Sequence, residues 1–264
     1  MKTIVGERIN STRKPIRHAI DNRDAGVIER EARMQQEKGA THIDVNAGGH
    51  GRPEQEDLLW LIDVVQRTVD LHLCIDSADP QVIAGVFSRL TKRPIINSVS
   101  LERQRMAGMA PFLTTHDCDI VGLCMSDEGV PQTAEKIVAR AQTLVRTLEE
   151  MGINRDQIHI DPLIQPIGTN HQNGRTVLQA IQGILETCPG VHLICGLTNI
   201  SFGMPERKQI NRCLLTLLMA GGLDGVILDP LDENLMKDLV TNTMLLGKDP
   251  YCLNYIKACK GNNN

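Results

Sequence analysis

Aromatic residues and long apolar segments are both scarce in this 264-residue sequence. Phe, Trp and Tyr make up only 2% of the chain, so the core must consist mainly of aliphatic side chains. No window approaches the roughly 20 apolar residues that a membrane-spanning helix needs. The first ten residues, MKTIVGERIN, lack the apolar stretch of a secretory signal. We therefore expect a cytoplasmic protein with no membrane segment.

The sequence also lacks an excess of positive charge and any C-x-x-C pair. Its net charge is -4 and its Lys and Arg residues are scattered, which argues against a nucleic-acid partner. Among the eight cysteines, Cys74, Cys124 and Cys195 fall within predicted buried strands. Reduced core cysteines therefore fit better than a disulfide framework. No His or Cys pair has the close spacing of a zinc site, and we expect no metal.

What the sequence does contain is eight short apolar segments, each of which stops at or beside a small polar, acidic or glycine residue. They are 3–7, 42–46, 71–76, 94–98, 119–123, 158–161, 192–199 and 225–229. Segments with helical spacing lie between them, namely 25–38, a helix opened by Pro53, one opened by Asp79 and Pro80, 102–116, 131–152, 175–187, 207–221 and 232–247. The alternation predicts parallel strands joined by helices.

The predicted fold is α/β, a single (β/α)8 TIM barrel, because about 250 residues and eight strand–helix units are typical of that fold. The barrel is expected to span residues 1–259, with 260–264 as a disordered tail. An open doubly wound sheet is the alternative. The absence of a glycine-rich phosphate loop after the first strand favours the barrel.

Carboxylates and carboxamides lie at the ends of several predicted strands. In a barrel these ends meet at one face, which carries the active site. Asp76, Asn97 and Asp161 can there converge on one planar ligand, since carboxylates accept paired hydrogen bonds and an amide both donates and accepts. A 2-amino-4-oxo heterocycle such as a pterin fits this set. The alternative for any single residue is a cap on the following helix.

Eight short motifs resemble those of the methyltetrahydrofolate:corrinoid-protein methyltransferases, in order and over nearly the whole chain. They are GERIN (6–10), DVN (44–46), CIDS (74–77), INS (96–98), GLCM (122–125), IDPLI (160–164), GLTNIS (196–201) and R-x-x-I-N-R (207–212). That family shares a pterin-binding barrel with dihydropteroate synthase and with the folate domain of methionine synthase. The resemblance thus implies the same barrel that the alternation predicts.

The resemblance also implies roles for particular residues. It makes Asn199 the catalytic residue, which reaches N5 of the folate. It implies that pterin and folate are bound by Asp76, Asn97, Asp161, Asn199, Arg207, Gly196 and Ile227. The pattern of strand ends adds Glu7, Asp44 and Asn46 as candidate polar residues of the pocket. Phe202 departs from the family, where we expect a glutamine, so one folate contact or the surface met by the partner differs here.

By resemblance, the reaction is methyl transfer between N5 of tetrahydrofolate and the cobalt of a corrinoid. We expect a separate corrinoid protein to carry the cobalamin, because this chain has no D-x-H-x-x-G motif. The direction favoured is from methylcorrinoid to tetrahydrofolate in an anaerobic demethylation pathway for glycine betaine, another methylamine or a methoxyaromatic. The alternatives are transfer from methyltetrahydrofolate to the corrinoid iron-sulfur protein in acetyl-CoA synthesis, or a dihydropteroate synthase-like activity. A homodimer is implied.

Overall fold

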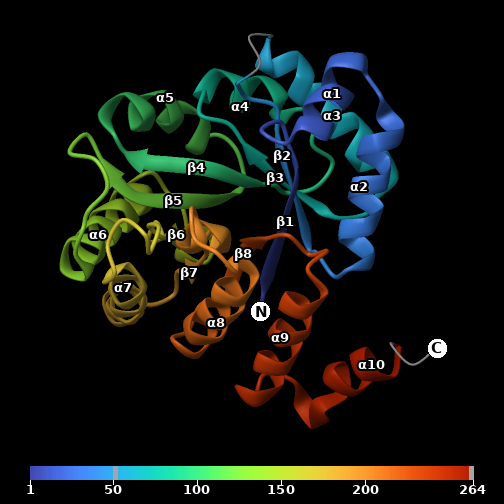
Figure 1. Cartoon of the computed structure of the whole chain (residues 1–264). Coiled ribbons are helices and arrows are strands. Elements are labelled where there is room, and N and C mark those ends of the chain that lie inside the picture. Colours follow the sequence, from blue (N-terminus) through green and yellow to red (C-terminus); the bar gives the residue numbers. More distant parts are fainter. Residues whose placement is uncertain (50–52, 262–264) are drawn as a thin grey trace.

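The computed structural model describes residues 1–49 and 53–261 and shows eight parallel strands surrounded by helices (Figure 1). The strands are β1 (Thr3–Asn10), β2 (His42–Asn46), β3 (His72–Asp76), β4 (Ile95–Leu101), β5 (Asp119–Ser126), β6 (Ile158–Asp161), β7 (His192–Leu193) and β8 (Gly225–Leu228). Their order in the sheet is β7-β6-β5-β4-β3-β2-β1-β8. A bridge between Gly196 and Ile227 brings the two ends of the sheet together. The predicted TIM barrel is confirmed.

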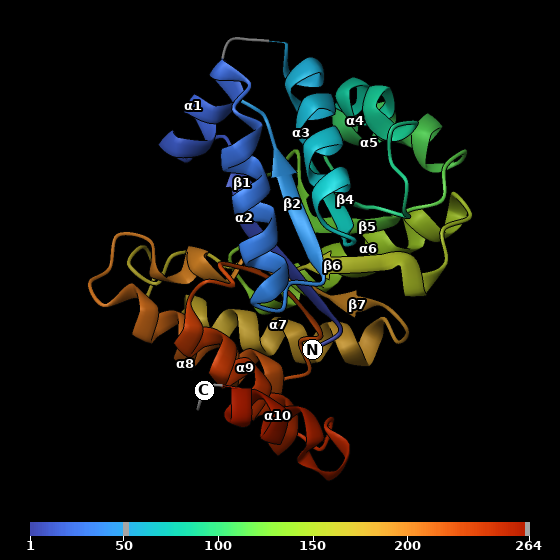
Figure 2. The ribbon, with the colours of Figure 1, turned by 90° about the vertical axis from the view of Figure 1, so that its right-hand side faces the viewer.

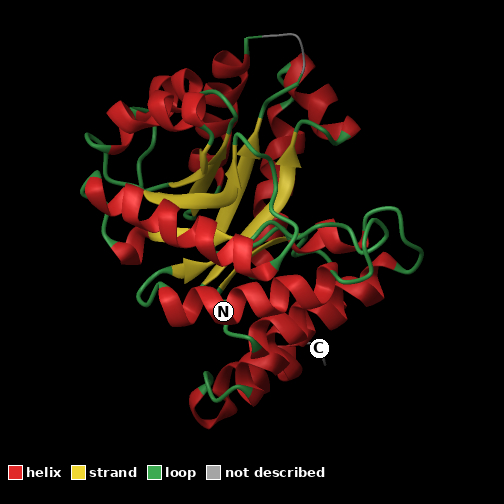
Figure 3. Cartoon of the chain, turned by 90° about the vertical axis from the view of Figure 1, so that its left-hand side faces the viewer, coloured by secondary structure: helices red, strands yellow, loops and turns green. Residues whose placement is uncertain are grey.

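Helices cover the outside of the strands, as Figure 3 shows most clearly. They are α1 (Lys14–Asn22), α2 (Ala25–Glu37), α3 (Glu54–Thr68), α4 (Pro80–Phe87), α5 (Arg103–Leu113), α6 (Ala134–Glu150), α7 (Asn173–Thr187), α8 (Arg207–Ala220), α9 (Glu233–Leu245) and α10 (Leu253–Gly261). Three short 3-10 helices are η1 (Arg155–Gln157), η2 (Leu197–Ser201) and η3 (Pro250–Cys252). All eight predicted helices are present. The sequence interpretation missed α1 and α10.

Local capping explains where several helices begin. Asp79 accepts a hydrogen bond of 2.8 Å from the backbone N–H of Gln81, and Pro80 occupies the first turn of α4, as predicted. Thr133 caps α6 in the same way. Helix α6 therefore starts at Ala134, three residues after the predicted start at Pro131. The side chain of a capping residue, rather than the proline, sets this boundary.

The seventh strand is shorter than the sequence predicts. We expected one strand through 192–199, but β7 ends at Leu193 and Asn199 lies in the 3-10 helix η2. Just beyond β7 the backbone N–H of Ile227 in β8 donates to the carbonyl of Cys195 at 2.8 Å, and Gly196 forms a bridge with Ile227. The chain leaves the sheet at this point, so Asn199 stands on a turn above the strand end.

The core is aliphatic, as the composition predicts, and divides into two parts. The larger part fills the space between strands and helices. The smaller one lies inside the barrel and contains Val5, Cys74, Ile95, Val121 and Ile194. All eight cysteines are free, and Cys74, Cys124 and Cys195 are buried.

The C-terminal helices α9 and α10 lie at one end of the molecule (Figure 2). Within the described ranges, no helix has both the length and the apolar character to cross a membrane. Of the predicted tail 260–264, Lys260 and Gly261 belong to α10 and 262–264 lie outside the described residues. The assignment of 1–259 as one domain stays a prediction.

Candidate active site

Side chains inside the barrel form levels along its axis. Successive residues of a strand point to opposite sides, so those two positions from a member of the inner apolar cluster also point inward. Towards the carboxyl ends of their strands, Val5 is followed in this way by Glu7 and Cys74 by Asp76. This upper part of the barrel interior, called the polar level below, is mostly polar, with Leu123, two positions after Val121, as an apolar exception. Its polar side chains are Glu7, Asp44, Asn46, Asp76, Asn97, Asp161 and Asp229, and Asp44 lies one inward position below Asn46 on β2.

Asp76 and Asn97 are direct neighbours at this level, since they are register partners on β3 and β4. Burial raises the pKa of Asp76, and a hydrogen bond from Asn46 opposes that rise. The Asn46 Nδ2 group donates to Asp76 Oδ2 at 3.0 Å. Asn46 in turn accepts from the fully buried Ser11 hydroxyl at 3.0 Å and from the Gly48 N–H at 3.1 Å. Asn46 thus holds Asp76 in place.

Asp161 ends β6 and is only 8% exposed. One carboxylate oxygen accepts a hydrogen bond of 2.7 Å from the backbone N–H of Leu163. Burial nevertheless raises the pKa of Asp161 to about 7, since this single hydrogen bond does not replace the lost hydration. The carboxyl group is therefore poised between its charged and neutral forms near neutral pH. A ligand offering N–H donors would favour the carboxylate.

Asp44 lies deeper than the other acids of this level. Burial, followed by the charge of Asp76, raises its pKa well above the ordinary value, while contacts with Cys74 and Asn97 oppose the rise. Its buried Oδ1 has no hydrogen-bond partner among residues 1–49 and 53–261. The protonated form of Asp44 is therefore the one that its surroundings favour.

Glu7 opens into a cavity of about 580 Å³ at the mouth of the barrel. The cavity is lined by Glu7, Arg8, Thr198, Arg207, Lys208, Asn211, Asp229, Leu231, Asp232 and Leu235. Burial and the charge of Asp229 raise the pKa of Glu7 to about 7, against the effect of Arg207, Arg13 and Arg8. Arg8 pairs with Glu31 at 2.6 Å and with Asp229 at 2.7 Å.

Asn199 and Gly196 lie together beside the bridge to Ile227. A Cβ atom on Gly196 would stand 3.2 Å from Asn199 Nδ2, closer than nine in ten real contacts of that kind. Glycine at this position therefore gives the Asn199 carboxamide its room. Asn199 itself is exposed at the barrel mouth, and Phe202, three residues later, is 69% exposed.

Arg207 braces the turn that carries Asn199. Its Nε group donates to Ser201 Oγ at 3.1 Å and its Nη2 group donates to Thr198 O at 3.1 Å. The side chain also lines the cavity beside Glu7. Arg207 thus couples the turn to the cavity, a local role that the sequence interpretation did not anticipate.

Two residues with strong contacts to this face were missed. Ser11 anchors Asn46, and Arg105 of α5 donates to the backbone carbonyls of Ser77, Ala78 and Ser98. Both act through residues distant in sequence, so no local pattern marks them. Within the described ranges, no group of three or more His, Cys, Asp or Glu side chains could hold a metal ion.

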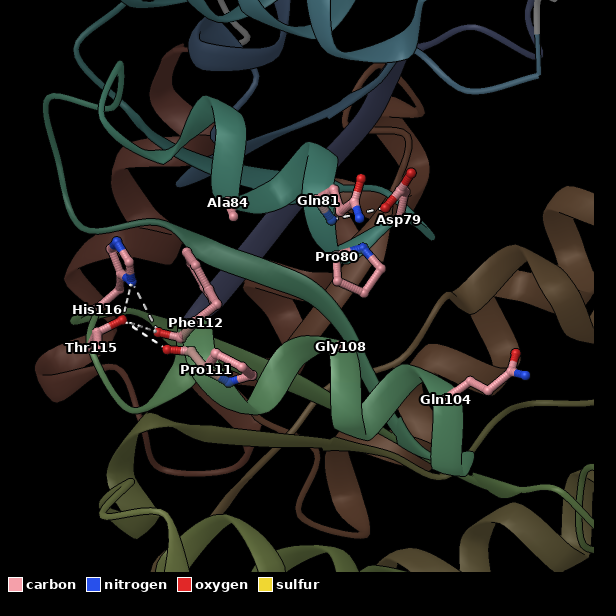
Figure 4. A pocket seen from close by; sticks show the side chains of 10 residues that line it. All are labelled: Asp79, Pro80, Gln81, Ala84, Gln104, Gly108, Pro111, Phe112, Thr115 and His116. Carbon is pink, nitrogen blue, oxygen red and sulfur yellow. Dashed lines mark hydrogen bonds between the residues drawn. The ribbon is translucent and has the colours of Figure 1, made fainter.

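A second cavity, of about 550 Å³, lies between α4 and α5 on the outside of the barrel (Figure 4). Its lining consists of Asp79, Pro80, Gln81, Ala84, Gln104, Gly108, Pro111, Phe112, Thr115 and His116. None of the sequence-predicted site residues lines it. The chemistry of the strand ends therefore lies elsewhere, at the barrel mouth.

Comparison with known proteins agrees with the polar barrel mouth. Residues 6–229 match the family model of pterin binding enzymes. The chain is 36% identical over 257 residues to a methylcorrinoid:tetrahydrofolate methyltransferase of Eubacterium limosum, covering 97% of this chain and 95% of that protein. It is 29% identical to methionine synthase of Mycobacterium tuberculosis over 85% of this chain but only 20% of that protein.

Solved structures of dihydropteroate synthases share the fold. The enzyme of Xanthomonas albilineans superposes with a TM-score of 0.70 at 19% identity, covering 93% of this chain and 92% of that one. The enzyme of Coxiella burnetii gives 0.70 at 14% identity, with coverage of 92% and 94%. At such identities the likeness concerns the fold alone. The family model and the Eubacterium relative together show that this chain belongs to the pterin-binding enzymes and is a methyltransferase.

Proposed function

We propose that this enzyme transfers a methyl group between N5 of tetrahydrofolate and the cobalt of a corrinoid carried by a separate protein. Its working direction is from methylcorrinoid to tetrahydrofolate, in the demethylation of glycine betaine, another methylamine or a methoxyaromatic. The 36% identity over nearly the whole of a methylcorrinoid:tetrahydrofolate methyltransferase supports the reaction and this direction. A cytoplasmic location, anaerobic metabolism and a homodimer belong to the same proposal.

The observation that carries the proposal is the polar upper level of the barrel. Asp76 and Asn97 stand side by side on neighbouring strands, and Asp161 ends a third. In the proposed complex the carboxylates accept hydrogen bonds from the 2-amino and ring N–H groups of the pterin. The Asn97 carboxamide donates a hydrogen bond to the pterin carbonyl. Burial sharpens this recognition, because an unmatched polar group here would lose its hydration without replacement.

Asn199 is the proposed catalytic residue, from the turn above β7. In the forward direction the N5 lone pair attacks the methyl carbon, a C–N bond forms, and the Co–C bond electrons remain on the cobalt. N5 then carries a proton that must be lost. In the reverse direction N5 must gain a proton or a strong hydrogen bond before the amine can leave. An amide has no useful pKa, but its oxygen can stabilise the protonated N5.

Proton exchange at N5 needs a group that titrates near neutral pH. Glu7 and Asp161, each with a pKa of about 7, are matched to that task. Glu7 shares the mouth cavity with Thr198, the residue before Asn199. We assign Glu7 to this proton exchange. A His or Cys nucleophile is unnecessary, because the reduced corrinoid and the amine are themselves the reacting nucleophiles.

The corrinoid enters as a second substrate on its carrier protein. The exposed position of Asn199 and the exposed Phe202 beside it suit a large partner that approaches the mouth. In this proposal the aromatic side chain of Phe202 meets the corrinoid protein. The presence of Phe202 in place of the expected glutamine would then adapt the enzyme to its particular partner.

The test is methyl transfer in both directions under strict anaerobiosis, followed by the cobalamin absorbance. Methylcobalamin with tetrahydrofolate, and cob(I)alamin with methyltetrahydrofolate, are each mixed with the protein, alone and with the native corrinoid protein. We expect turnover in both mixtures and none with heat-inactivated protein. Absence of turnover with the carrier-bound corrinoid, in a protein that forms dihydropteroate from a pterin pyrophosphate and 4-aminobenzoate, would replace this proposal with the synthase activity.

A further inference from the structure

Arg105 reaches from α5 to the two loops that follow β3 and β4. Its Nε and Nη2 groups donate to Ser98 O at 2.9 and 2.6 Å. Its Nη1 group donates to Ala78 O at 2.6 Å, and Nη2 donates also to Ser77 O at 3.0 Å. Because a guanidinium is planar and its donors have fixed directions, these four hydrogen bonds set the three carbonyl groups relative to one another.

The three carbonyls belong to residues that directly follow Asp76 and Asn97, two of the side chains of the polar level. Ser77 follows Asp76, and Ser98 follows Asn97. Both serines are buried, and the backbone N–H of Ser77 also donates to Asn97 O at 3.1 Å. The backbone at both positions is therefore fixed by the side chain of Arg105, which does not line the mouth cavity.

We propose that Arg105 is a positioning residue for pterin recognition, which aims the Asp76 and Asn97 side chains at the ring by clamping the backbone behind them. The inference rests on the proposed function, since it takes the pterin as the ligand of this level. A lysine could not replace it, because an ammonium group cannot present the same planar fork to carbonyls of two loops. Neither the sequence motifs nor the family likeness points to this residue.

A second effect of Arg105 separates positioning from simple stability. Burial raises the pKa of Asp76, and the hydrogen bond from Asn46 and the positive charge of Arg105 oppose that rise. Loss of the charge moves the pKa of Asp76 further upward, so pterin binding should then need a higher pH. A purely structural role of Arg105 would leave that pH profile unmoved.

The test compares Arg105→Lys with Arg105→Gln in equilibrium titrations with tetrahydrofolate from pH 5.5 to 8.5. The number of binding sites per protein molecule gives the fraction of protein that is folded. At pH 8 we expect affinity per folded site to fall about tenfold in both, the cost of lost charge-assisted hydrogen bonds. The fall of folate affinity at low pH, the acid limb of the profile, should shift to higher pH only in Arg105→Gln. KM for folate should rise in both with kcat changed less than threefold. Arg103→Gln, on the same helix with an 89% exposed side chain, is the control and should behave as wild type.

Wild-type affinity per folded site in both variants would overturn the proposal, as would an unmoved acid limb in Arg105→Gln. If Arg105→Gln does not fold, the affinity of Arg105→Lys decides. Asp76→Asn separates this inference from the proposed function. If Asp76→Asn leaves folate affinity unchanged, the pterin pocket itself is wrong. If it weakens binding while the Arg105 variants do not, only the positioning role is wrong.

Discussion

Strand β6 places His159 near its beginning and Asp161 at its end, so one short strand supplies a buried titratable side chain to each end of the barrel. At the lower end, burial and the neighbouring His192 lower the pKa of His159 to about 4. At the upper end, burial raises the pKa of Asp161 to about 7. The same physical cause, loss of hydration, acts on both. At neutral pH, however, His159 is neutral, whereas Asp161 is divided between its protonated and charged forms.

Two histidines of the lower end are already neutral at pH 7. Histidines begin or nearly begin four strands, and their rings pack in pairs, His42 with His72 at 5.3 Å and His159 with His192 at 5.0 Å. His192 Nδ1 lies 2.6 Å from Asp224. Burial lowers the pKa of His42 and of His159 to about 4, so these two rings do not change their charge near pH 7. Glu7 and Asp161 at the upper end, each with a pKa of about 7, can change theirs when a ligand binds.

Removing Asn199 should have the largest effect at the upper end. We expect Asn199→Ala to slow methyl transfer by about 10- to 1000-fold, the scale of one positioned catalytic hydrogen bond, with folate affinity nearly unchanged. Single-turnover rates and equilibrium folate binding measure the two effects separately. Equal losses in both would make Asn199 a contact of the bound substrate rather than of the transition state.

The two ends should respond to acid with opposite signs. Between pH 6.5 and 4 the unfolded chain protonates His159 and the folded one does not, so acid destabilises the fold through this group. The stability of the wild type relative to His159→Gln should therefore fall by about 3 kcal/mol as the pH drops from 7 to 4. Urea unfolding at each pH measures it.

Asp161→Asn provides the matched comparison on the same strand. The folded protein holds a proton on Asp161 that the unfolded chain has lost above its ordinary pKa of 3.8. The wild type should therefore gain stability relative to this variant as the pH falls from 7 to 4. If the free energy of unfolding depends on pH in the same way in both variants and the wild type, the proposed electrostatic difference between the two ends does not exist.

Folate affinity should depend on Asp161 and not on His159. Asp161→Ala should weaken pterin binding by about 1 to 3 kcal/mol, since a ligand donor loses its buried acceptor. His159→Gln should leave the affinity unchanged within about twofold. Isothermal titration with tetrahydrofolate measures both variants. An unchanged affinity in Asp161→Ala would refute its place in the pocket.

The pH dependence of folate binding should give the smallest effect of this series. The carboxylate form of Asp161 is the acceptor, and its pKa in the free protein is about 7. Folate affinity should therefore rise as the pH increases and level off above about pH 8, with about a tenfold loss per pH unit well below pH 7. Because binding favours the carboxylate form of Asp161, folate binding at pH 6.5 should release protons to the buffer. Asp161→Asn should remove the part of this pH dependence that Asp161 contributes and leave the part that comes from Asp76.

Much of this architecture could be read from the sequence, because aliphatic segments and the small polar residues that end them mark strands locally. Helix α1 was missed although Ile16, Ala19 and Ile20 share one buried face, since nine residues give little periodicity. The predicted end of β7 was wrong because Ile194 and Cys195 are as buried as strand residues, yet each keeps only a single backbone hydrogen bond to a neighbouring strand and the strand ends at Leu193. Burial alone does not specify pairing.

The candidate site divides in the same way. Asp76, Asn97 and Asp161 could be named because strand ends are a local feature and the resemblance supported them. Ser11 and Arg105 could not, since Ser11 acts through a hydrogen bond to Asn46 and Arg105 joins Ser98 to the distant Ser77 and Ala78. The supporting role of Asn46 likewise appears only once β2 and β3 lie side by side.

The most direct test of the central claim is a crystal structure of the protein with tetrahydrofolate bound. We predict the pterin ring at the upper end of the barrel, with its amino and N–H edge on Asp161 and Asp76 and with N5 within reach of the Asn199 carboxamide. A pterin bound in the cavity between α4 and α5, or with its edge away from both carboxylates, would contradict it.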